Sequence, residues 1–241
     1  MKPSPLLPAN SWLDELARQI ERLRVSIDPD AVHRLRVSAG RLSVWLEVGG
    51  RRALRDDLRG LRRSAGAVRD LDVIASNAAQ VADAAWVETL RQERAEEAAR
   101  LRAAIGSSRI DALVEALSLV PEPDPVCVRS AMQRMKRRVL RAGDRLEEPE
   151  GSERALHRLR RRLRRLRYAL DWTGSEVKDL RALQENLGDL NNLSIELEKL
   201  DTRKGDPALD GRRKFVRNEM DEHRKRALGA WRDLRPRIGE L

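Results

Sequence analysis

The sequence predicts an all-α fold built from two antiparallel helical bundles, and three observations lead to this prediction. Leucines recur at steps of three and four residues along nearly the whole chain, which is the spacing of amphipathic helices. No stretch alternates apolar and polar residues as a half-buried strand does. A histidine-led sequence occurs twice, on either side of a proline-rich segment. We therefore expect two bundles related by internal duplication and pseudo-twofold symmetry.

Six helices are predicted in the first half of the chain, residues 10–120. Asp28 and Pro29 mark the start of the second of them, because Asp caps a helix and Pro is favourable in its first turn. Gly49-Gly50 ends that helix. The expected helices span about 10–26, 29–48, 51–65, 70–84, 86–105 and 107–119.

The strongest break in the sequence is Pro121-Glu122-Pro123-Asp124-Pro125. Three prolines in five residues do not continue a helix, so residues 121–125 are expected to link the halves. The second half, residues 126–241, is predicted to form helices at about 126–145, 152–173, 176–188, 190–203 and 208–234. Both halves are expected to belong to one domain that spans residues 1–241.

The charge of the chain predicts an anionic partner. The formal net charge is +10 and the pI is about 10.6, a balance that bears on partners rather than on fold. Cys127 is the single cysteine, which excludes a disulfide framework. No apolar run reaches the length of a membrane span, and residues 1–10 lack the apolar core of a secretory signal. We therefore expect a cytoplasmic protein without membrane contact.

The two histidine-led segments match over several residues. Val32-His33-Arg34-Leu35-Arg36 recurs as Leu156-His157-Arg158-Leu159-Arg160. A glycine follows each histidine at a similar separation along the sequence, Gly66 after His33 and Gly188 after His157. Any two amphipathic helices share leucines by chance, but the chain has only three histidines, so two in the same register favour a duplicated helical unit.

The helix predicted over residues 151–173 is the most basic segment of the chain. Its buried stripe is formed by Leu156, Leu159, Leu163, Leu166 and Leu170. At 100° per residue, His157, Arg161 and Arg164 lie on the opposite side, and Arg160 and Arg167 lie near the border of the stripe. Residues 154–167 include eight arginines and no acidic residue. An external polyanion would relieve their repulsion; the alternative is a solvated basic face compensated by acidic helices elsewhere.

These residues resemble a known family. The repeated His-x-x-Arg helix, together with Val-Arg-Asp-Leu-Asp-Val at 68–73 and Leu-Gly-Asp-Leu-Asn-Asn-Leu at 187–193, is similar to the CHAD domain, the conserved-histidine α-helical domain. The resemblance covers nearly the whole chain. It implies two four-helix bundles around a basic groove, binding of long-chain inorganic polyphosphate, and association with polyphosphate granules in some members.

The resemblance also implies the binding residues. In the second half they are His157, Arg160, Arg161, Arg164 and Arg167, and in the first half His33, Arg36 and Arg41. Because Gly40 and Ser43 stand where the family usually has further basic residues, we expect the second half to dominate. Two further basic clusters are either additional ligands or ordinary surface: Arg134, Arg137, Arg138 and Arg141 after the linker, and Arg212, Arg213 and Lys214 near the end.

The strongest alternative is a nucleic-acid-associated or scaffold protein that uses the same basic face. Proteins that bind single strands usually offer aromatic platforms, whereas this chain has five Trp, one Tyr and one Phe. The tryptophans occur in helical apolar registers, which favours packing in the core over stacking on bases. They are Trp12, Trp45, Trp86, Trp172 and Trp231.

No catalytic arrangement is readable, so the sequence predicts a binding protein rather than an enzyme, with no metal or cofactor. His33 and His157 lack a second ligand at helical spacing, which a zinc site requires. Asp70 and Asp72 have the spacing of a magnesium-binding pair, but they fall at a predicted helix start, where capping or a salt bridge is the better interpretation. His223 is expected to be a plain surface histidine.

Overall fold

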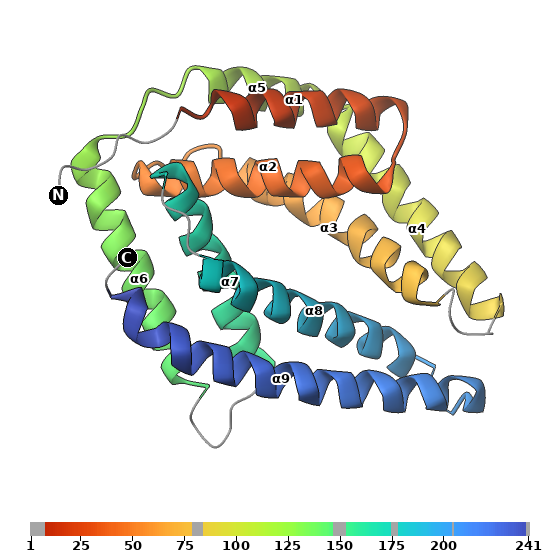
Figure 1. Ribbon diagram of the computed structural model, residues 1–241. Helices are drawn as coiled ribbons and strands as arrows, with labels where there is room; N and C mark the ends of the chain where they lie inside the picture. The colour runs from red at the N-terminus through yellow and green to blue at the C-terminus, as the bar shows by residue number, and fades with distance from the viewer. Residues whose placement is uncertain (1–7, 79–83, 147–152, 175–177, 204, 240–241) are drawn as a thin grey trace. The chain divides into compact units, whose positions relative to one another are not determined.

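The computed structural model describes residues 8–78, 84–146, 153–174, 178–203 and 205–239. Within these ranges the chain forms α-helices, one short 3-10 helix and no strand, which confirms the predicted all-α class (Figure 1). The chain divides into two compact units, unit 1 from Met1 to Val128 and unit 2 from Arg129 to Leu241.

In unit 1, each of the first four helices runs antiparallel to the helix before it (Figure 1). α1 packs on α2, α2 on α3 and α3 on α4, while α5 lies along α1 (Figure 1). The predicted apolar stripe of α2 faces this core, since Leu35, Ala39, Leu42 and Leu46 are at most 1% exposed. The helices of the described part of unit 1 are α1 Asn10–Val25, α2 Pro29–Val48, α3 Arg55–Ala78, α4 Ala84–Ile105 and α5 Ser108–Ser118.

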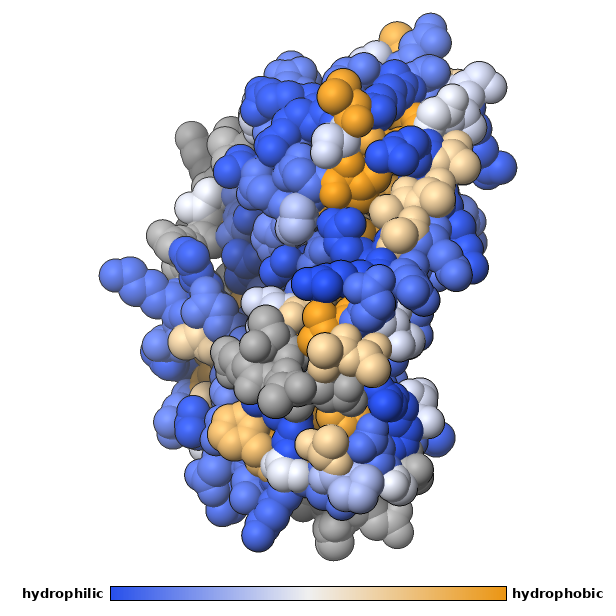
Figure 2. Space-filling model, turned by 90° about the vertical axis from the view of Figure 1, so that its right-hand side faces the viewer, coloured by the Kyte–Doolittle hydropathy of each residue, from blue (hydrophilic) through white to orange (hydrophobic). Residues whose placement is uncertain are grey.

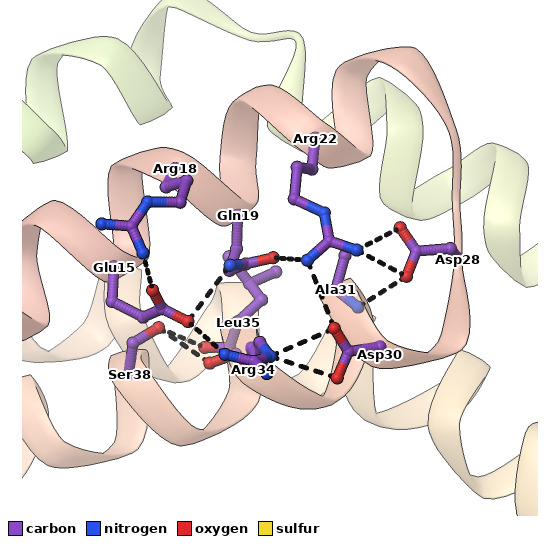
Figure 3. Close-up of polar contacts among 10 residues, drawn as sticks. All are labelled: Glu15, Arg18, Gln19, Arg22, Asp28, Asp30, Ala31, Arg34, Leu35 and Ser38. Atoms are coloured by element: carbon purple, nitrogen blue, oxygen red, sulfur yellow. Dashed lines mark hydrogen bonds and ion pairs between the residues drawn. The ribbon is translucent and has the colours of Figure 1, made fainter.

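A charged network fixes the first turn of α2 against α1 (Figure 3). The Asp28 carboxylate accepts a hydrogen bond from the Ala31 amide at 2.8 Å and so caps the helix. The Arg22 guanidinium of α1 donates to Asp28 at 3.2 and 3.3 Å and to Asp30 at 3.2 Å. Side chains of α1 therefore position the start of α2, and with it His33 in the second turn.

In unit 2, α8 packs against both α7 and α9. The predicted leucine stripe of α7 is confirmed as its buried face: Leu156, Leu159, Leu163, Leu166 and Leu170 are at most 3% exposed. The elements are α6 Pro125–Asp144, which begins in the last residues of unit 1, α7 Glu153–Trp172, α8 Lys178–Asp201, the 3-10 helix η1 Pro207–Leu209, and α9 Asp210–Ile238.

α6 approaches α9 closely at one glycine. A Cβ added at Gly143 would overlap the indole ring of Trp231, which is fully buried. The expectation that tryptophans pack in the core is confirmed for Trp45, Trp86, Trp172 and Trp231, all at most 3% exposed. Trp12 is partly exposed.

The predicted breaks in the third and eighth helices are wrong. α3 runs unbroken from Arg55 to Ala78, where two helices at 51–65 and 70–84 were expected, and α8 is likewise one helix. The breaks were expected around Gly66 and Gly188. An interior glycine costs only about 1 kcal/mol relative to alanine, so the buried leucines on both sides of each glycine hold the helix together.

The surface is largely hydrophilic in the face that Figure 2 shows, with smaller apolar areas between the charged side chains. Large hydrophobic residues that are at least half exposed include Val25, Leu119, Val126 and Phe215. Among the described helices, none is long and apolar enough to cross a membrane.

Candidate functional site

The two repeated histidines occupy the same position in their helices. His33 is the fifth residue of α2 and His157 the fifth residue of α7, and both side chains are exposed. In each unit the arginine three residues later reaches the next long helix. Arg36 contacts Asp70 of α3, and Arg160 contacts Asn191 of α8. The internal duplication itself stays a prediction from the sequence repeat.

In unit 2, His157 and Arg160 line a small surface pocket between α7 and α8. Arg160 Nη1 donates to Asn191 Oδ1 at 2.9 Å, and Asn191 lines the pocket together with His157. The Ser194 hydroxyl donates to the Glu153 carboxylate. The pocket thus combines polar side chains and leucines from two helices. Its lining is Glu153, Leu156, His157, Arg160, Leu187, Leu190, Asn191 and Ser194.

His157 lies in a positive electrostatic field. Partial burial lowers the pKa of its imidazole, and the positive charges of Arg161, Arg160 and Arg164 lower it further, although the hydrogen bond with Asn191 acts in the opposite direction. The ring is therefore biased toward its neutral form until an anion arrives.

The basic face of α7 continues toward α6. Burial lowers the pKa of Arg162, and the neighbouring charges of Arg138 on α6 and Arg161 on α7 lower it further. Arg138 therefore belongs to the same positive surface as α7. Arg134 and Arg137 are also exposed on α6, but no described contact joins either one to α7.

Arg167 is held two turns further along α7. Its Nε donates to Gln184 Oε1 of α8 at 2.7 Å, and its Nη1 lies 3.9 Å from the Asp171 carboxylate. Its guanidinium also lies 5.0 Å from the centre of the Tyr168 ring. Arg167 is thus oriented by α8, as Arg160 is.

The corresponding cluster in unit 1 contains a carboxylate. Arg36 Nη1 lies 3.4 Å from the Asp70 carboxylate. Partial burial lowers the pKa of His33, followed by the charges of Arg69 and Arg36, while Asp30 raises it. Arg69 was not among the predicted ligands, although it stands inside the segment 68–73 that carried the family resemblance.

Arg41, which the resemblance proposed as a ligand, faces a different neighbour. Its guanidinium lies over the ring of Trp12, 4.2 Å from the centroid, on the α1 side of α2. Arg36, by contrast, points to α3. The structure therefore joins His33, Arg36 and Arg69 in one cluster and does not bring Arg41 to it.

The net charge of the protein is unequally divided. Residues 1–128 contain 19 basic and 19 acidic residues, whereas residues 129–241 contain 30 basic and 20 acidic ones. The whole formal net charge of +10 therefore lies in unit 2. This division could have been read from the sequence once the boundary between the units was known.

The arginines near the end of the chain are structural. Arg213 is 5% exposed and donates to the Asp210 carboxylate at 2.6 Å and to the backbone carbonyl of Leu200 at 2.9 Å. Arg212 Nε donates at 2.6 Å to Glu196, which is fully buried. These contacts fasten the start of α9 to α8, so Arg212 and Arg213 are removed from the set of candidate ligands.

One further expectation is confirmed in part, and another is corrected. Asp70 and Asp72 lie inside α3 and do not cap a helix, while the salt-bridge alternative is confirmed by Arg36 and by Arg94, whose Nε lies 2.5 Å from Asp72. His223 is partly buried and bonds Asn186 of α8. Among the described residues, no group of three or more His, Cys, Asp or Glu is arranged to hold a metal ion.

Two of the solved structures that match the chain illustrate its fold. The CHAD domain from the plant Ricinus communis matches with a TM-score of 0.63 at 22% identity, over 99% of this chain and 93% of that chain. PptA from Streptomyces chartreusis matches with a TM-score of 0.67 at 19% identity, over 95% of this chain and 100% of that chain. The sequence model of the CHAD domain matches residues 9–201. No curated protein matches the chain.

Proposed function

Because the chain belongs to the CHAD domain family, some members of which bind polyphosphate, we propose that it binds inorganic polyphosphate, mainly through unit 2. The observation that carries the proposal is the location of the charge, since the whole net charge of +10 lies in that unit. The cluster of His33, Arg36 and Arg69 in unit 1 contributes less, because Asp70 already pairs with Arg36.

The chemistry of the α7 face suits a chain of phosphates. A guanidinium offers a planar fork of donors that matches two phosphate oxygens. Arg158 and Arg161 are exposed on α7 without a carboxylate partner among the described residues, so phosphate oxygens can reach them. Each phosphate that they neutralise releases condensed counterions, which makes binding favourable and sensitive to salt.

The experiment compares two double variants with the same change in charge. Arg160→Ala with Arg161→Ala removes two charges from the α7 face. Lys214→Ala with Arg226→Ala removes two from exposed positions of α9. In a titration with long-chain polyphosphate near 0.1 M salt, the α7 variant is expected to bind roughly 20- to 60-fold more weakly, from a slope of about 0.7–0.9 per lost contact. If both variants lost the same affinity, binding would depend on the total charge and not on the α7 face, and the proposal would be overturned.

Nucleic acid is the competing ligand. Four of the five tryptophans are buried, at most 3% exposed, so they are not available as stacking platforms for bases. Long-chain polyphosphate is therefore expected to displace duplex DNA and RNA at matched phosphate concentration. If the protein retained either nucleic acid in preference to polyphosphate, the alternative of a nucleic-acid-associated protein would be favoured.

The proposed role is binding and not catalysis. Incubation of the protein with polyphosphate and Mg²⁺ is expected to release no phosphate above the rate without protein, and metal-dependent release would contradict this. Binding of this kind would bring the protein to polyphosphate granules, which fluorescence microscopy of a tagged chain tests.

A further inference from the structure

The pocket between α7 and α8 contains a carboxylate as well as cationic and neutral donors. Glu153 lines it together with His157 and Arg160, all three from α7. The side chains that α8 contributes to the lining are uncharged, namely Asn191, Ser194 and two leucines. A fully ionised phosphate in this pocket meets a like charge at Glu153, which repels it. The lining therefore suits a ligand that brings a hydrogen-bond donor as well as negative charge.

The Glu153 carboxylate keeps acceptor sites for such a donor. It accepts a hydrogen bond from the Ser194 hydroxyl, and it forms an ion pair with no described residue. An ionised carboxylate has about four acceptor sites on its two oxygens. Because Glu153 is also exposed, a ligand can reach the remaining sites. Ser194 thus fixes the direction of the carboxylate without using up its acceptors.

The other polar groups of the pocket complete a mixed set of donors and acceptors. The guanidinium of Arg160 donates only, and the amide nitrogen of Asn191 is a donor while its oxygen accepts from Arg160. Partial burial and the neighbouring arginines lower the pKa of His157, so its neutral ring also offers an acceptor nitrogen. The pocket therefore presents acceptors and donors together.

The two kinds of phosphate in a polyphosphate chain differ in this respect. An internal phosphate keeps no proton near neutral pH and offers acceptors only. A terminal phosphate has a second, weakly acidic hydroxyl, with a pKa of about 6 in a phosphate monoester. In its singly protonated form it has a P–OH donor beside ionised oxygens, and this combination matches the lining of the pocket.

The size of the pocket agrees with a single terminal group. Its volume of about 280 Å³ includes the solvent at its mouth, and ligand pockets usually measure about 300–1,000 Å³. Arg158 and Arg161, by contrast, are exposed on α7 outside this lining. An extended chain can therefore bind along the exposed face while the pocket takes one phosphate.

We propose that the pocket is a chain-end site, which binds the singly protonated terminal phosphate of polyphosphate. The P–OH donates to Glu153, and the ionised oxygens accept from Arg160 and Asn191. Internal phosphates bind instead to the exposed arginines of α7. This inference rests on the proposed function and adds a preference for chain ends to it.

The first test compares linear tripolyphosphate with cyclic trimetaphosphate, which contains the same number of phosphates but has no end. Near pH 6 the wild type is expected to bind the linear ligand more tightly. Glu153→Gln removes the repulsion of fully ionised phosphates, so the ratio of the two affinities is expected to fall about fivefold, the effect of one charge at about 4 Å in water. Glu222→Gln, at an exposed position of α9, is the control with the same change in charge. An unchanged ratio in Glu153→Gln would overturn the chain-end site.

The second test follows the affinity for linear tripolyphosphate from about pH 6 to 8. The terminal phosphate loses its proton in this range, so the wild type is expected to bind more weakly as the pH rises. Glu153→Gln is expected to lose less, because an amide can donate to the ionised form. The charged or titratable groups of the lining are Glu153, His157 and Arg160. His157 is present in both proteins, so the difference between them isolates Glu153, and identical pH profiles would contradict the proposal.

Orthophosphate carries the same protonated group without a chain and separates the two sources. Tripolyphosphate is expected to bind more tightly, since its remaining phosphates reach the exposed arginines. Tighter binding of orthophosphate would identify the free ion as the ligand and overturn the chain-end site. Thermal unfolding verifies that each variant is folded. Failure of the wild type to bind long-chain polyphosphate would overturn the proposed function itself, whereas an effect-free Glu153→Gln would overturn only the chain-end site.

Discussion

Gly143 of α6 lies directly against the indole ring of Trp231 of α9, leaving no space for a side chain between the two helices. This contact joins α6 to a fully buried residue of α9. Gly143→Ala is therefore expected to lower the free energy of unfolding by about 1–3 kcal/mol, the usual cost of overpacking a core. Urea denaturation measures the change. Gly229→Ala is the control, because a Cβ there meets nothing within 4 Å, and a small gain of about 0.5–1 kcal/mol is expected inside a helix. Equal stability of both variants would contradict the close contact.

The affinity for polyphosphate is expected to rise as the pH falls from about 8 to 5. In the free protein, partial burial and neighbouring arginines hold the pKa of His157 below its ordinary value, and a bound phosphate would raise it, so binding takes up a proton. The gain appears as the pH falls through the raised pKa of the bound state. The groups that face the ring from α7 and α8 include Glu153, Arg160 and Asn191. Fluorescence titrations of the wild type and His157→Gln at several pH values measure the effect. The same dependence of affinity on pH in both proteins would show that His157 is not the group that takes up the proton.

Arg212→Ala is expected to destabilise the protein without weakening the ligand site. Its partner Glu196 is fully buried, so the substitution leaves a buried carboxylate without this donor, at a cost of about 3–5 kcal/mol. Thermal unfolding measures the loss. Below the transition, the affinity for polyphosphate is expected to stay within about twofold of wild type; a large drop in the folded variant would return Arg212 to the ligand set.

Arg41→Ala is expected to change binding less than Arg160→Ala does. The Arg41 guanidinium lies on the ring of Trp12, away from the cluster around His33, and this contact is worth about 0.5–1 kcal/mol of stability. Isothermal titration with polyphosphate compares the two variants. A loss for Arg41→Ala as large as that for Arg160→Ala would show that ligand binding recruits Arg41.

Features that depend on the apolar and polar faces of a single helix could be predicted from the sequence. The leucine stripe of α7 and the exposure of His157 follow from a period of 3.6 residues, and both are confirmed. Contacts between side chains of two different helices could not be predicted from the sequence. Arg213 and Arg161 look alike in a basic run, but the first is buried among carbonyls and a carboxylate, and the second is exposed. Asn191 lies in the segment 187–193 that carried the family resemblance, but its contact with Arg160 could not be predicted, because only packing selects the residue of α8 that meets Arg160.

Because the net charge lies in unit 2, the association rate and the dissociation rate of a polyphosphate complex are expected to depend on different residues. An excess of +10 in unit 2 acts over a Debye length and steers a polyanion before any contact forms, so it governs the association rate. The hydrogen-bonded arginines at the α7–α8 interface act only at contact distance and govern the dissociation rate. Removing remote charges such as Lys214 and Arg226 would thus slow the encounter, whereas removing Arg160 from the pocket would shorten the time for which a captured chain stays bound.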